Sequence, residues 1–151
     1  MKLIITSASS NLLSSDLFAR VTLMTESGEI TVLPGHAPLL SAVRPGILMA
    51  EYYVGNKIHT LECVTGGGVL NISDDECTIV VDVIENSDSL TDLEYIEWQK
   101  KEAEALMRAY REENGAIIDP HRLVEIEYDL LKYTAMHRLG QKYHEHGSSR
   151  K

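Results

Sequence analysis

Residues 32–46 of the chain read VLPGHAPLLSAVRPG. This stretch holds three of the four prolines and two of the ten glycines of a 151-residue sequence. A Pro-Gly pair stands near each end, Pro34-Gly35 and Pro45-Gly46. The pair is typical of a tight turn, because proline presets φ and glycine accepts the positive φ that many reversals require. We therefore expect two rigid corners around a largely non-helical connection, with β-structure on either side and the functional surface near the corner.

Short segments rich in Val, Ile, Thr, Leu and Tyr lie before and after these corners. They cover residues 3–6, 17–24, 29–33, 47–54, 57–64, 68–73 and 77–83. Gly55-Asn56 fits the two-residue primed turn of a β-hairpin, and residues 73–76 fit a second reversal. The imperfect alternation of residues 78–81 suggests a strand that is buried on both faces. Strands of this length with turns at short spacing are typical of an antiparallel sandwich or barrel.

The composition of the chain changes near Ile84. Strand-like segments precede this point, whereas Glu, Lys, Ala and Leu dominate after it. We therefore predict a β-sandwich domain over residues 1–84, a linker over residues 85–90 and a helical hairpin over residues 91–151. The polar end of the hairpin, from Lys142 onward, is expected to fray.

Two amphipathic patterns follow the boundary. Thr91-Asp92 fits the cap of a first helix and Asn114-Gly115 fits its stop. Asp119-Pro120 fits the start of a second helix, and Gly140 fits its end. The apolar positions at steps of three, four or seven are Leu93, Ile96, Ala103, Leu106, Met107 and Tyr110, then Leu123, Ile126, Leu130 and Tyr133. Two such helices with a short connection predict an antiparallel hairpin.

The overall charge and composition exclude several classes of protein. A formal net charge of −9 argues against nucleic acid or anionic lipid as the main partner. No apolar run approaches the roughly 20 residues that span a bilayer, and residues 1–6 form too short an apolar block for a signal peptide. Cys63 and Cys77 each lie in an apolar segment, which favours two reduced, buried thiols.

A few residues invite a chemical role. Gly66-Gly67-Gly68 could be a phosphate loop, but no Lys-Ser or Lys-Thr follows it, so a bulge or a close backbone approach is the better interpretation. His137, His144 and His146 lack the fourth ligand of a metal site. The carboxylates of residues 74–76 lie in an expected hairpin tip, and no nucleophile stands with a base. This chemistry favours an interaction protein, with neither a catalytic nor a metal site.

The second helix has an asymmetric charge distribution. Its acidic residues come early and its basic residues come late, namely Glu125, Glu127 and Asp129, then Lys132, Arg138 and Lys142. Complementarity to the helix dipole is one explanation. The other is that the basic end docks on an acidic partner surface. The sequence pattern leaves both open.

Residues 27–46 closely resemble the GEFGVLPGHAPLLTALKPG signature of the epsilon subunit family of F-type ATP synthases. The likeness continues in residues 64–69, VTGGGV, where the family has VSGGF, and in residues 78–82, TIVVD, where it has VTILAD. The two-helix tail completes the family layout. The resemblance thus covers nearly the whole chain and is most specific in the PGHAPLL block, although Thr31 stands where the family has its second glycine.

The resemblance implies a fold of mainly β plus α class. We expect an N-terminal antiparallel β-sandwich of about ten strands followed by a C-terminal two-helix antiparallel hairpin. It also implies a non-catalytic rotor subunit in the central stalk of a proton- or sodium-translocating ATP synthase, peripheral on the cytoplasmic face of the bacterial cell membrane. The implied partners are the gamma subunit, the c-ring and, through the hairpin, the catalytic alpha and beta subunits.

The same resemblance implies two contact surfaces. The loop that holds Glu29, Pro34, Gly35 and His36 would face the polar loops of the c-ring. In bacterial relatives the hairpin can extend along gamma and block ATP hydrolysis, or fold down against the sandwich. The late basic residues of the second helix, Lys132, Arg138 and Lys142, are then candidates for an inhibitory contact.

A regulatory nucleotide is the remaining implication. Some relatives bind ATP at the folded-down hairpin through an I/L-D-x-x-R-A motif, and residues 118–123 fit this motif except for Leu123. Asp119 and Arg122 are therefore candidate ATP ligands, and no other cofactor is expected. The alternative function is a free-standing β-sandwich ligand-binding module with a helical dimerisation hairpin, which would not co-purify with gamma.

Overall fold

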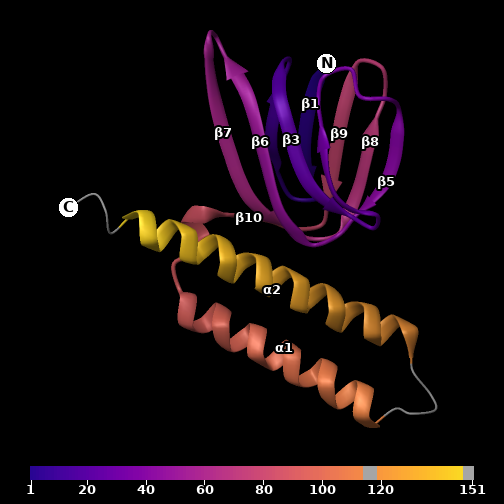
Figure 1. Cartoon of the computed structure of the whole chain (residues 1–151), viewed down its shortest axis with the longest axis vertical. Helices are drawn as coiled ribbons and strands as arrows, with labels where there is room; N and C mark the ends of the chain where they lie inside the picture. Colours follow the sequence, from indigo (N-terminus) through magenta and orange to yellow (C-terminus); the bar gives the residue numbers. More distant parts are fainter. Residues whose placement is uncertain (114–118, 148–151) are drawn as a thin grey trace.

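The computed structural model describes residues 1–113 and 119–147. A β-sheet structure forms the first part, and two helices follow it (Figure 1). The strands are β1 (Lys2–Ser7), β2 (Asn11–Ser15), β3 (Phe18–Thr25), β4 (Gly28–Val32), β5 (Leu39–Val43), β6 (Gly46–Val54), β7 (Lys57–Thr65), β8 (Gly68–Ile72), β9 (Glu76–Val81) and β10 (Ile84–Asn86). A short 3-10 turn, η1 (Ser87–Ser89), leads to the helices α1 (Leu93–Glu113) and α2 (Pro120–Gly147). The predicted fold class is confirmed.

The ten strands form one sheet that folds on itself as a sandwich. Its order is β10-β7-β6-β3-β5-β8-β9-β1-β2, with β4 paired to β3. A single residue pair, Thr25 opposite Val43, joins β3 to β5, so the sheet divides there into two layers. The pairing is antiparallel except between β1 and β9, which run parallel. Side chains between the layers form the core, including Leu3, Ile5, Phe18, Val21, Leu23, Leu48, Leu70 and Ile79.

The first predicted corner is confirmed as a tight turn. The amide of His36 donates to the carbonyl oxygen of Leu33 at 3.0 Å. Gly35 has φ of 84°, and proline followed by a positive-φ glycine is the pattern of a type II turn. The second corner differs, because Gly46 begins β6 without a positive φ. A Cβ on Gly46 would lie 3.1 Å from Cβ of Met24, so close packing rather than turn geometry favours glycine there.

The triple glycine is confirmed as a place where chain segments approach closely. A Cβ on Gly66 would collide with the Asp82 carboxylate, and one on Gly68 would collide with the backbone of Val80. A Cβ on Gly67 would lie 2.7 Å from Cε2 of Tyr128 in α2. The triplet therefore lets both a neighbouring strand and a helix pack against the backbone, which is a different use of glycine from a phosphate loop.

Several strand expectations need correction. Residues 78–81 are buried on one face only, because Val80 is 46% exposed while Ile79 and Val81 point into the core. The strands β2 and β5 were not expected from local composition, since β2 is serine-rich and β5 lies inside the stretch read as a connection. The expected linker over residues 85–90 contains the end of β10, which pairs with β7, and then η1.

The helices begin where their caps predict. The Asp92 carboxylate accepts a hydrogen bond from the amide of Tyr95 at 2.9 Å, and the Asp119 carboxylate accepts one from His121 at 3.0 Å. The expected end of the second helix at Gly140 is wrong, because α2 continues to Gly147. The predicted stop of the first helix, Asn114-Gly115, lies outside the described residues.

Gly140 has a packing role instead of a terminating one. A Cβ at this position would lie 2.5 Å from Cδ2 of Leu93, so the two helices meet closely here. Most of the predicted apolar stripe faces this helix–helix contact, but Leu106 is 47% exposed. Leu106 lies about 100° round the helix from buried Met107 and lines an open cleft with Val124 and Ile126 of α2, which leaves it partly in contact with solvent.

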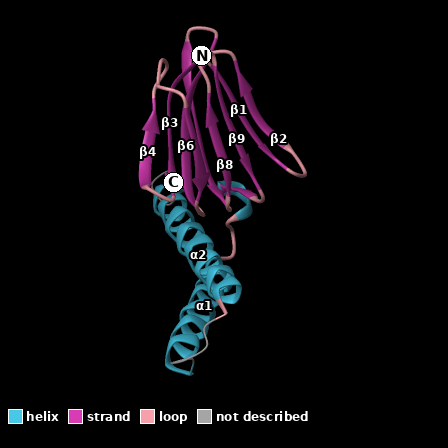
Figure 2. Cartoon of the chain, turned by 90° about the vertical axis from the view of Figure 1, so that its right-hand side faces the viewer, coloured by secondary structure: helices cyan, strands magenta, loops and turns pink. Residues whose placement is uncertain are grey.

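The hairpin is folded down against the sandwich. The helix α2 lies between the sandwich and α1 and packs on β6 and β7 (Figures 1 and 2). A second apolar cluster fills this contact and consists of Val64, Leu90, Ile96, Ala135 and Leu139, with Ile47 and Met136 beside them. Within residues 1–113 and 119–147, neither helix has the length and apolar character that a membrane span requires.

Candidate functional site

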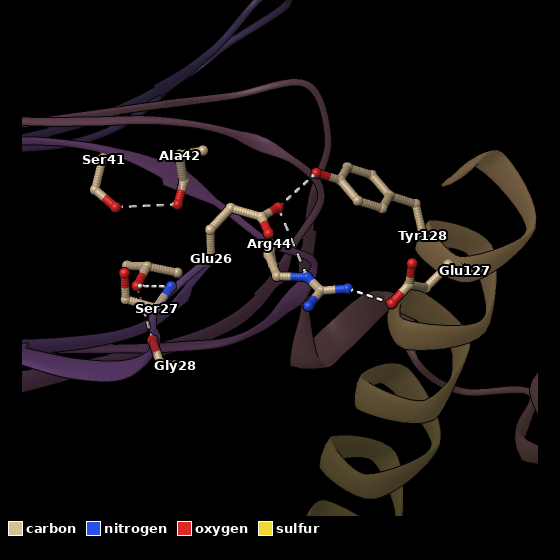
Figure 3. Close-up of polar contacts among 9 residues, drawn as sticks. Glu26, Ser27, Gly28, Ser41, Ala42, Arg44, Glu127 and Tyr128 are labelled. Atoms are coloured by element: carbon tan, nitrogen blue, oxygen red, sulfur yellow. Dashed lines mark hydrogen bonds and ion pairs between the residues drawn. The ribbon is translucent and has the colours of Figure 1, made fainter. Parts of the chain in front are cut away.

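The polar contact between α2 and the sandwich centres on Arg44 (Figure 3). Its Nη2 donates to Oε1 of Glu127 in α2 at 2.5 Å, and its Nε lies 3.8 Å from Oε1 of Glu26. The hydroxyl of Tyr128 donates to the same Glu26 oxygen at 3.2 Å. We call Glu26, Arg44, Glu127 and Tyr128 the Arg44 cluster. It joins the β3–β4 turn, the β5–β6 corner and α2.

The electrostatics of this cluster follow from its composition. The hydrogen bond to Glu127 raises the pKa of Arg44 above its ordinary value, so the guanidinium stays charged. Burial, and then the charge of Glu26, raises the pKa of Tyr128, which keeps the phenol neutral and able to donate. The cluster thus pairs one cation and one neutral donor with two carboxylates.

A second polar contact lies near the C-terminal end of α2. Nζ of Lys142 donates to Oε1 of Glu62 in β7 at 2.6 Å, and the hydroxyl of Tyr143 donates to Oε2 of the same residue at 3.2 Å. The Glu62 side chain is only 12% exposed. Burial, and then the charge of Glu62, raises the pKa of Tyr143. The helix α2 is therefore attached to the sandwich at two places along its length.

The structure separates the residues predicted to contact the c-ring. Pro34, Gly35 and His36 form the turn beyond the end of β4, with the ring Nδ1 of His36 2.7 Å from the carbonyl oxygen of Ala37. Because a carbonyl only accepts, Nδ1 is the donor in this contact. Glu29 lies near the start of β4 and lines a cavity of about 340 Å³ with Arg138 and Lys142 of α2.

The basic residues predicted to make an inhibitory contact differ in what they contact within the chain. Lys142 binds Glu62, and Arg138 lines the cavity that also contains Glu29. Nζ of Lys132 lies 3.4 Å from Oδ1 of Asp129 and 4.9 Å from the centre of the Tyr133 ring. In the folded-down arrangement, Lys142 is therefore the one of these three residues for which the structure gives an ion pair with the sandwich.

The candidate ATP ligands already have partners of their own. The Asp119 carboxylate caps α2, and Nη1 of Arg122 lies 3.2 Å from Oε2 of Glu125. Arg122 lines a cleft of about 370 Å³ between the helices and the sandwich. The acidic residues of that cleft are Asp82, Glu125 and Asp129. Three carboxylates around one guanidinium disfavour a polyphosphate unless a cation accompanies it. Ile118, the first position of the motif, lies outside the described residues.

One face of the sandwich has two rows of cross-strand neighbours that contain no charged side chain. Each row crosses five strands and takes one residue from each. Strand register places the rows on the outer face of β5, β8, β9, β1 and β2. The rows are Leu40, Asn71, Thr78, Ile4 and Ser14, then Ala42, Val69, Val80, Thr6 and Asn11. Leu40 is 74% exposed, and a quarter of all residues in the chain are charged. We call these ten residues the neutral face, and such a surface is typical of a protein–protein contact.

The Arg44 cluster and the neutral face were not found by sequence reasoning. Arg44 and Glu127 are 83 positions apart, and no local pattern links such residues. The neutral face requires knowledge of strand register, which joins β1 to β9 across most of the sandwich sequence. The local sequence feature at Arg44 that could have drawn attention to it is the proline that follows, because Pro45 restricts the backbone of the residue before it.

Comparison with known proteins gives a consistent family. Residues 1–87 match the family described as ATP synthase, Delta/Epsilon chain, beta-sandwich domain. An ATP synthase epsilon chain from Bordetella petrii is 29% identical over 99 residues, covering 66% of this chain and 68% of the relative. Those from Desulfitobacterium hafniense and Rhodospirillum rubrum are 38% and 35% identical, and the matches cover 46% and 51% of their lengths. The match thus spans about half the length of these two relatives.

Two solved assemblies contain chains of similar fold. A chain in the Euglena gracilis mitochondrial ATP synthase OSCP/F1/c-ring structure matches with a TM-score of 0.68 and 24% identity, over 89% of this chain and 77% of that one. A chain in the Tetrahymena thermophila central stalk/c-ring structure matches with a TM-score of 0.51 and 20% identity, over 61% and 70%. Because the family match spans the whole sandwich and the curated relatives share one name, the chain belongs to the ATP synthase delta/epsilon chain family as an epsilon subunit.

Proposed function

We propose that this chain is a non-catalytic subunit of the central stalk of a proton- or sodium-translocating F-type ATP synthase. It couples ion flow through the c-ring to ATP synthesis by linking the ring to the gamma subunit. The family match over residues 1–87, the part that forms the sandwich, carries this proposal. Its setting is peripheral, at the cytoplasmic face of a bacterial cell membrane, in keeping with bacterial relatives such as that of Bordetella petrii.

Gamma is the partner proposed for the neutral face. A rotor contact must hold under torque, and burial of apolar surface gives an attachment that salt does not screen. Val69 and Val80 are cross-strand neighbours near the middle of this face, and both are exposed. Their side chains point away from the core, so charged replacements there disturb the surface and spare the fold.

Co-purification with gamma tests this assignment. The double variant Val69→Lys/Val80→Lys is expected to lose gamma while its thermal unfolding stays close to that of the parent chain. Val54→Lys is the matched control, because Val54 is also exposed but lies at the tip of the β6–β7 hairpin. If the parent chain itself fails to bind gamma and forms a dimer instead, the free-standing ligand-binding module is the better description.

The c-ring is the partner proposed for the Pro34-Gly35-His36 turn and for Glu29. The type II turn fixes the backbone at His36, and Nδ1 is taken up by the carbonyl oxygen of Ala37, which leaves Nε2 as the ring nitrogen that would meet a ring loop. We expect His36→Ala with Glu29→Ala to weaken coupling between ATP synthesis and ion flow in membrane vesicles. Normal coupling in the double variant contradicts the contact. Because Glu29 also faces α2, the single variant His36→Ala isolates the contribution of the turn.

The hairpin is proposed to inhibit ATP hydrolysis when it leaves the sandwich. Lys132, Arg138 and Lys142 would then be free to reach acidic surfaces of the alpha and beta subunits. Deletion of residues 114–151 is expected to raise ATP hydrolysis by the assembled complex. Unchanged hydrolysis counts against inhibition without affecting the proposed rotor role.

A regulatory ATP at Asp119 and Arg122 stays a prediction. Its support is the motif and the position of Arg122 in a cleft of suitable size. The test is an NMR titration with millimolar MgATP, in which the amide resonances of Asp119 and Arg122 should shift. Resonances that do not move would eliminate the site, and Arg122→Ala is the variant that should abolish a genuine response.

A further inference from the structure

Three chain segments meet at the Arg44 cluster, and their charges do not balance. Glu26 comes from the β3–β4 turn, Glu127 comes from α2, and Arg44 is the cation that the structure places between them. Without its guanidinium, two carboxylates from different parts of the molecule would face each other across the docking contact. Like charges repel more strongly where they are partly shielded from water.

The backbone of Arg44 is held by the sandwich. Its amide donates to the carbonyl oxygen of Met24 at 3.0 Å, and buried Pro45 follows it. The side chain is 25% exposed, and its buried Nε has no hydrogen-bond partner among the described residues. The guanidinium therefore depends on Glu127 for its one short bond, whereas the backbone that carries it is fixed by the sandwich.

Glu127 has no comparable partner within its own helix. The residues three and four positions away on either side are Leu123, Val124, Leu130 and Leu131. No cation is available at these spacings, which are the ones that allow ion pairs on a helix surface. Lys142 differs, because Glu145 lies three residues further along α2. Undocking therefore leaves Glu127 without a cation but offers Lys142 a replacement.

The steric fit beside the cluster is equally close. The ring of Tyr128 lies over Gly67, where no side chain intervenes, and its hydroxyl reaches Glu26. The cluster thus forms only when α2 lies against the triple glycine. The bonds of the cluster to Glu127 and Tyr128 and this backbone contact therefore form together.

We propose that the Arg44 cluster is a clasp that sets the equilibrium between docked and released hairpin, without needing a bound nucleotide. Ionic strength is the variable to which the clasp responds, because its main bond joins a guanidinium and a partly exposed carboxylate. That this equilibrium regulates ATP hydrolysis rests on the proposed inhibitory function of the released hairpin. The equilibrium itself is a property of the single chain.

Distance measurements on the full-length chain test the clasp. Spin labels on Asp74→Cys in the β8–β9 turn and Glu102→Cys in α1 report how far the hairpin lies from the sandwich; both positions are exposed. Cys63 and Cys77 are buried, so they do not compete for the label. Distances are recorded from about 0.05 M to about 1 M salt, where screening changes from weak to nearly complete.

Arg44→Met is the main variant, because it keeps the aliphatic stem and removes the charge. At low salt we expect about a tenfold fall in the ratio of docked to released molecules, as for loss of one charge-assisted hydrogen bond. The salt dependence seen in the parent chain should become shallower. The exchange Arg44→Glu/Glu127→Arg should recover part of the docked population that Arg44→Glu loses.

The matched control is Arg20→Met. Nη2 of Arg20 lies 2.6 Å from Oε1 of Glu51, which is the same kind of ion pair within the sandwich alone. This variant should leave the distance distribution unchanged. If Arg44→Met disturbs folding of the sandwich, Glu127→Gln removes the same bond from the helix side. The clasp is overturned if Glu127→Gln and Arg44→Met both keep the distance distribution of the parent chain at every salt concentration.

Measuring ATP hydrolysis by the assembled complex distinguishes failure of the clasp from failure of the proposed inhibitory function. If release inhibits, Arg44→Met should lower hydrolysis relative to Arg20→Met. A shifted distance distribution with unchanged hydrolysis would uphold the clasp and refute the inhibitory role of the hairpin. An unchanged distribution with normal rotor assembly would refute the clasp and leave the rotor role intact.

Discussion

Gly67 shows how a single missing side chain decides where a helix can dock. The ring of Tyr128 occupies the space that a Cβ would need. The Pro34-Gly35 turn could be predicted from sequence, because its geometry depends on the two residues that make it. The roles of Gly46, Gly67 and Gly140 could not, since each accommodates a side chain from a segment distant in the sequence. The ion pairs of Arg44 and Glu62 could not be predicted for the same reason, since their partners in α2 are distant in the sequence.

Gly67→Ala should therefore weaken docking of the hairpin. The new methyl group would lie 2.7 Å from Cε2 of Tyr128, so the ring or the helix must move. Overpacking of this kind costs about 1–3 kcal/mol. Thermal unfolding and the hairpin distance measure the effect. In a Tyr128→Ala background the same substitution should cost much less, and an equal cost in both backgrounds would contradict the steric explanation.

The two cysteines should be unreactive in the folded protein. Burial, and then the neighbouring Glu62, raises the pKa of Cys63 to about 12, and burial, then Glu76, raises that of Cys77 to about 11. Because the thiolate is the reacting species, a disulfide reagent at about pH 8 should modify neither thiol until the chain unfolds. Counting modified thiols with and without denaturant checks this. Rapid modification of Cys63 in the native state would show that β7 opens locally.

At the scale of elements, the two helices were predictable in kind and in their starts. Asp92 and Asp119 cap helices because a carboxylate at that position accepts an otherwise unpaired amide, which is a local effect. The end of α2 was not predictable, because apolar packing carries the helix through Gly140. The strand β5 was missed because its partner β8 comes much later in the chain, and Leu40 points outward on a face that the sequence does not identify.

Removal of a cap should destabilise the hairpin by a modest amount. Asp92→Ala deletes the bond to the amide of Tyr95, and such caps contribute about 1 kcal/mol. The midpoint of helix unfolding, followed by circular dichroism, should fall accordingly. Thr91→Ala, beside the cap but outside this bond, is the control, and an equal loss in both variants would show that the capping bond is not responsible.

Alkaline pH should release the hairpin. The raised pKa values of Tyr128 and Tyr143 mean that both phenols are favoured in their neutral form when α2 is docked. Their contribution is complete below the ordinary tyrosine pKa of 10.0 and is lost as the pH rises through the raised values. The docked fraction should therefore fall above about pH 10. In Tyr128→Phe/Tyr143→Phe this fall should flatten, and an undiminished fall would show that the two phenols are not responsible.

At the scale of the whole molecule, the folded-down hairpin leaves the outer side of α1 uncovered. Trp98 is the only tryptophan of the chain and is 57% exposed on α1, with the Tyr95 ring 6.2 Å away between centres. The helix α2 lies between α1 and the strands that carry the neutral face (Figure 2). The proposed gamma contact and the hairpin therefore occupy different parts of the molecule.

Binding of gamma should leave Trp98 accessible. If gamma docks on the neutral face with the hairpin still folded down, quenching of tryptophan fluorescence by acrylamide should be the same before and after the complex forms. The experiment uses a gamma subunit that lacks tryptophan or has its tryptophans replaced, so that the fluorescence comes from Trp98 alone. Strong protection of Trp98 on binding would mean that gamma also contacts α1 or that the hairpin is released.

The parallel pairing of β1 with β9 has a consequence for how the protein is made. Lys2 lies opposite Glu76, so β1 can pair with β9 only after β9, far later in the sequence, has emerged from the ribosome. Until then β1 can pair only with β2, and its other edge stays open to solvent and to neighbouring nascent chains. Closure of the sandwich is thus a late, long-range event during synthesis. A ribosome that stalls before β9 would present this open edge to chaperones.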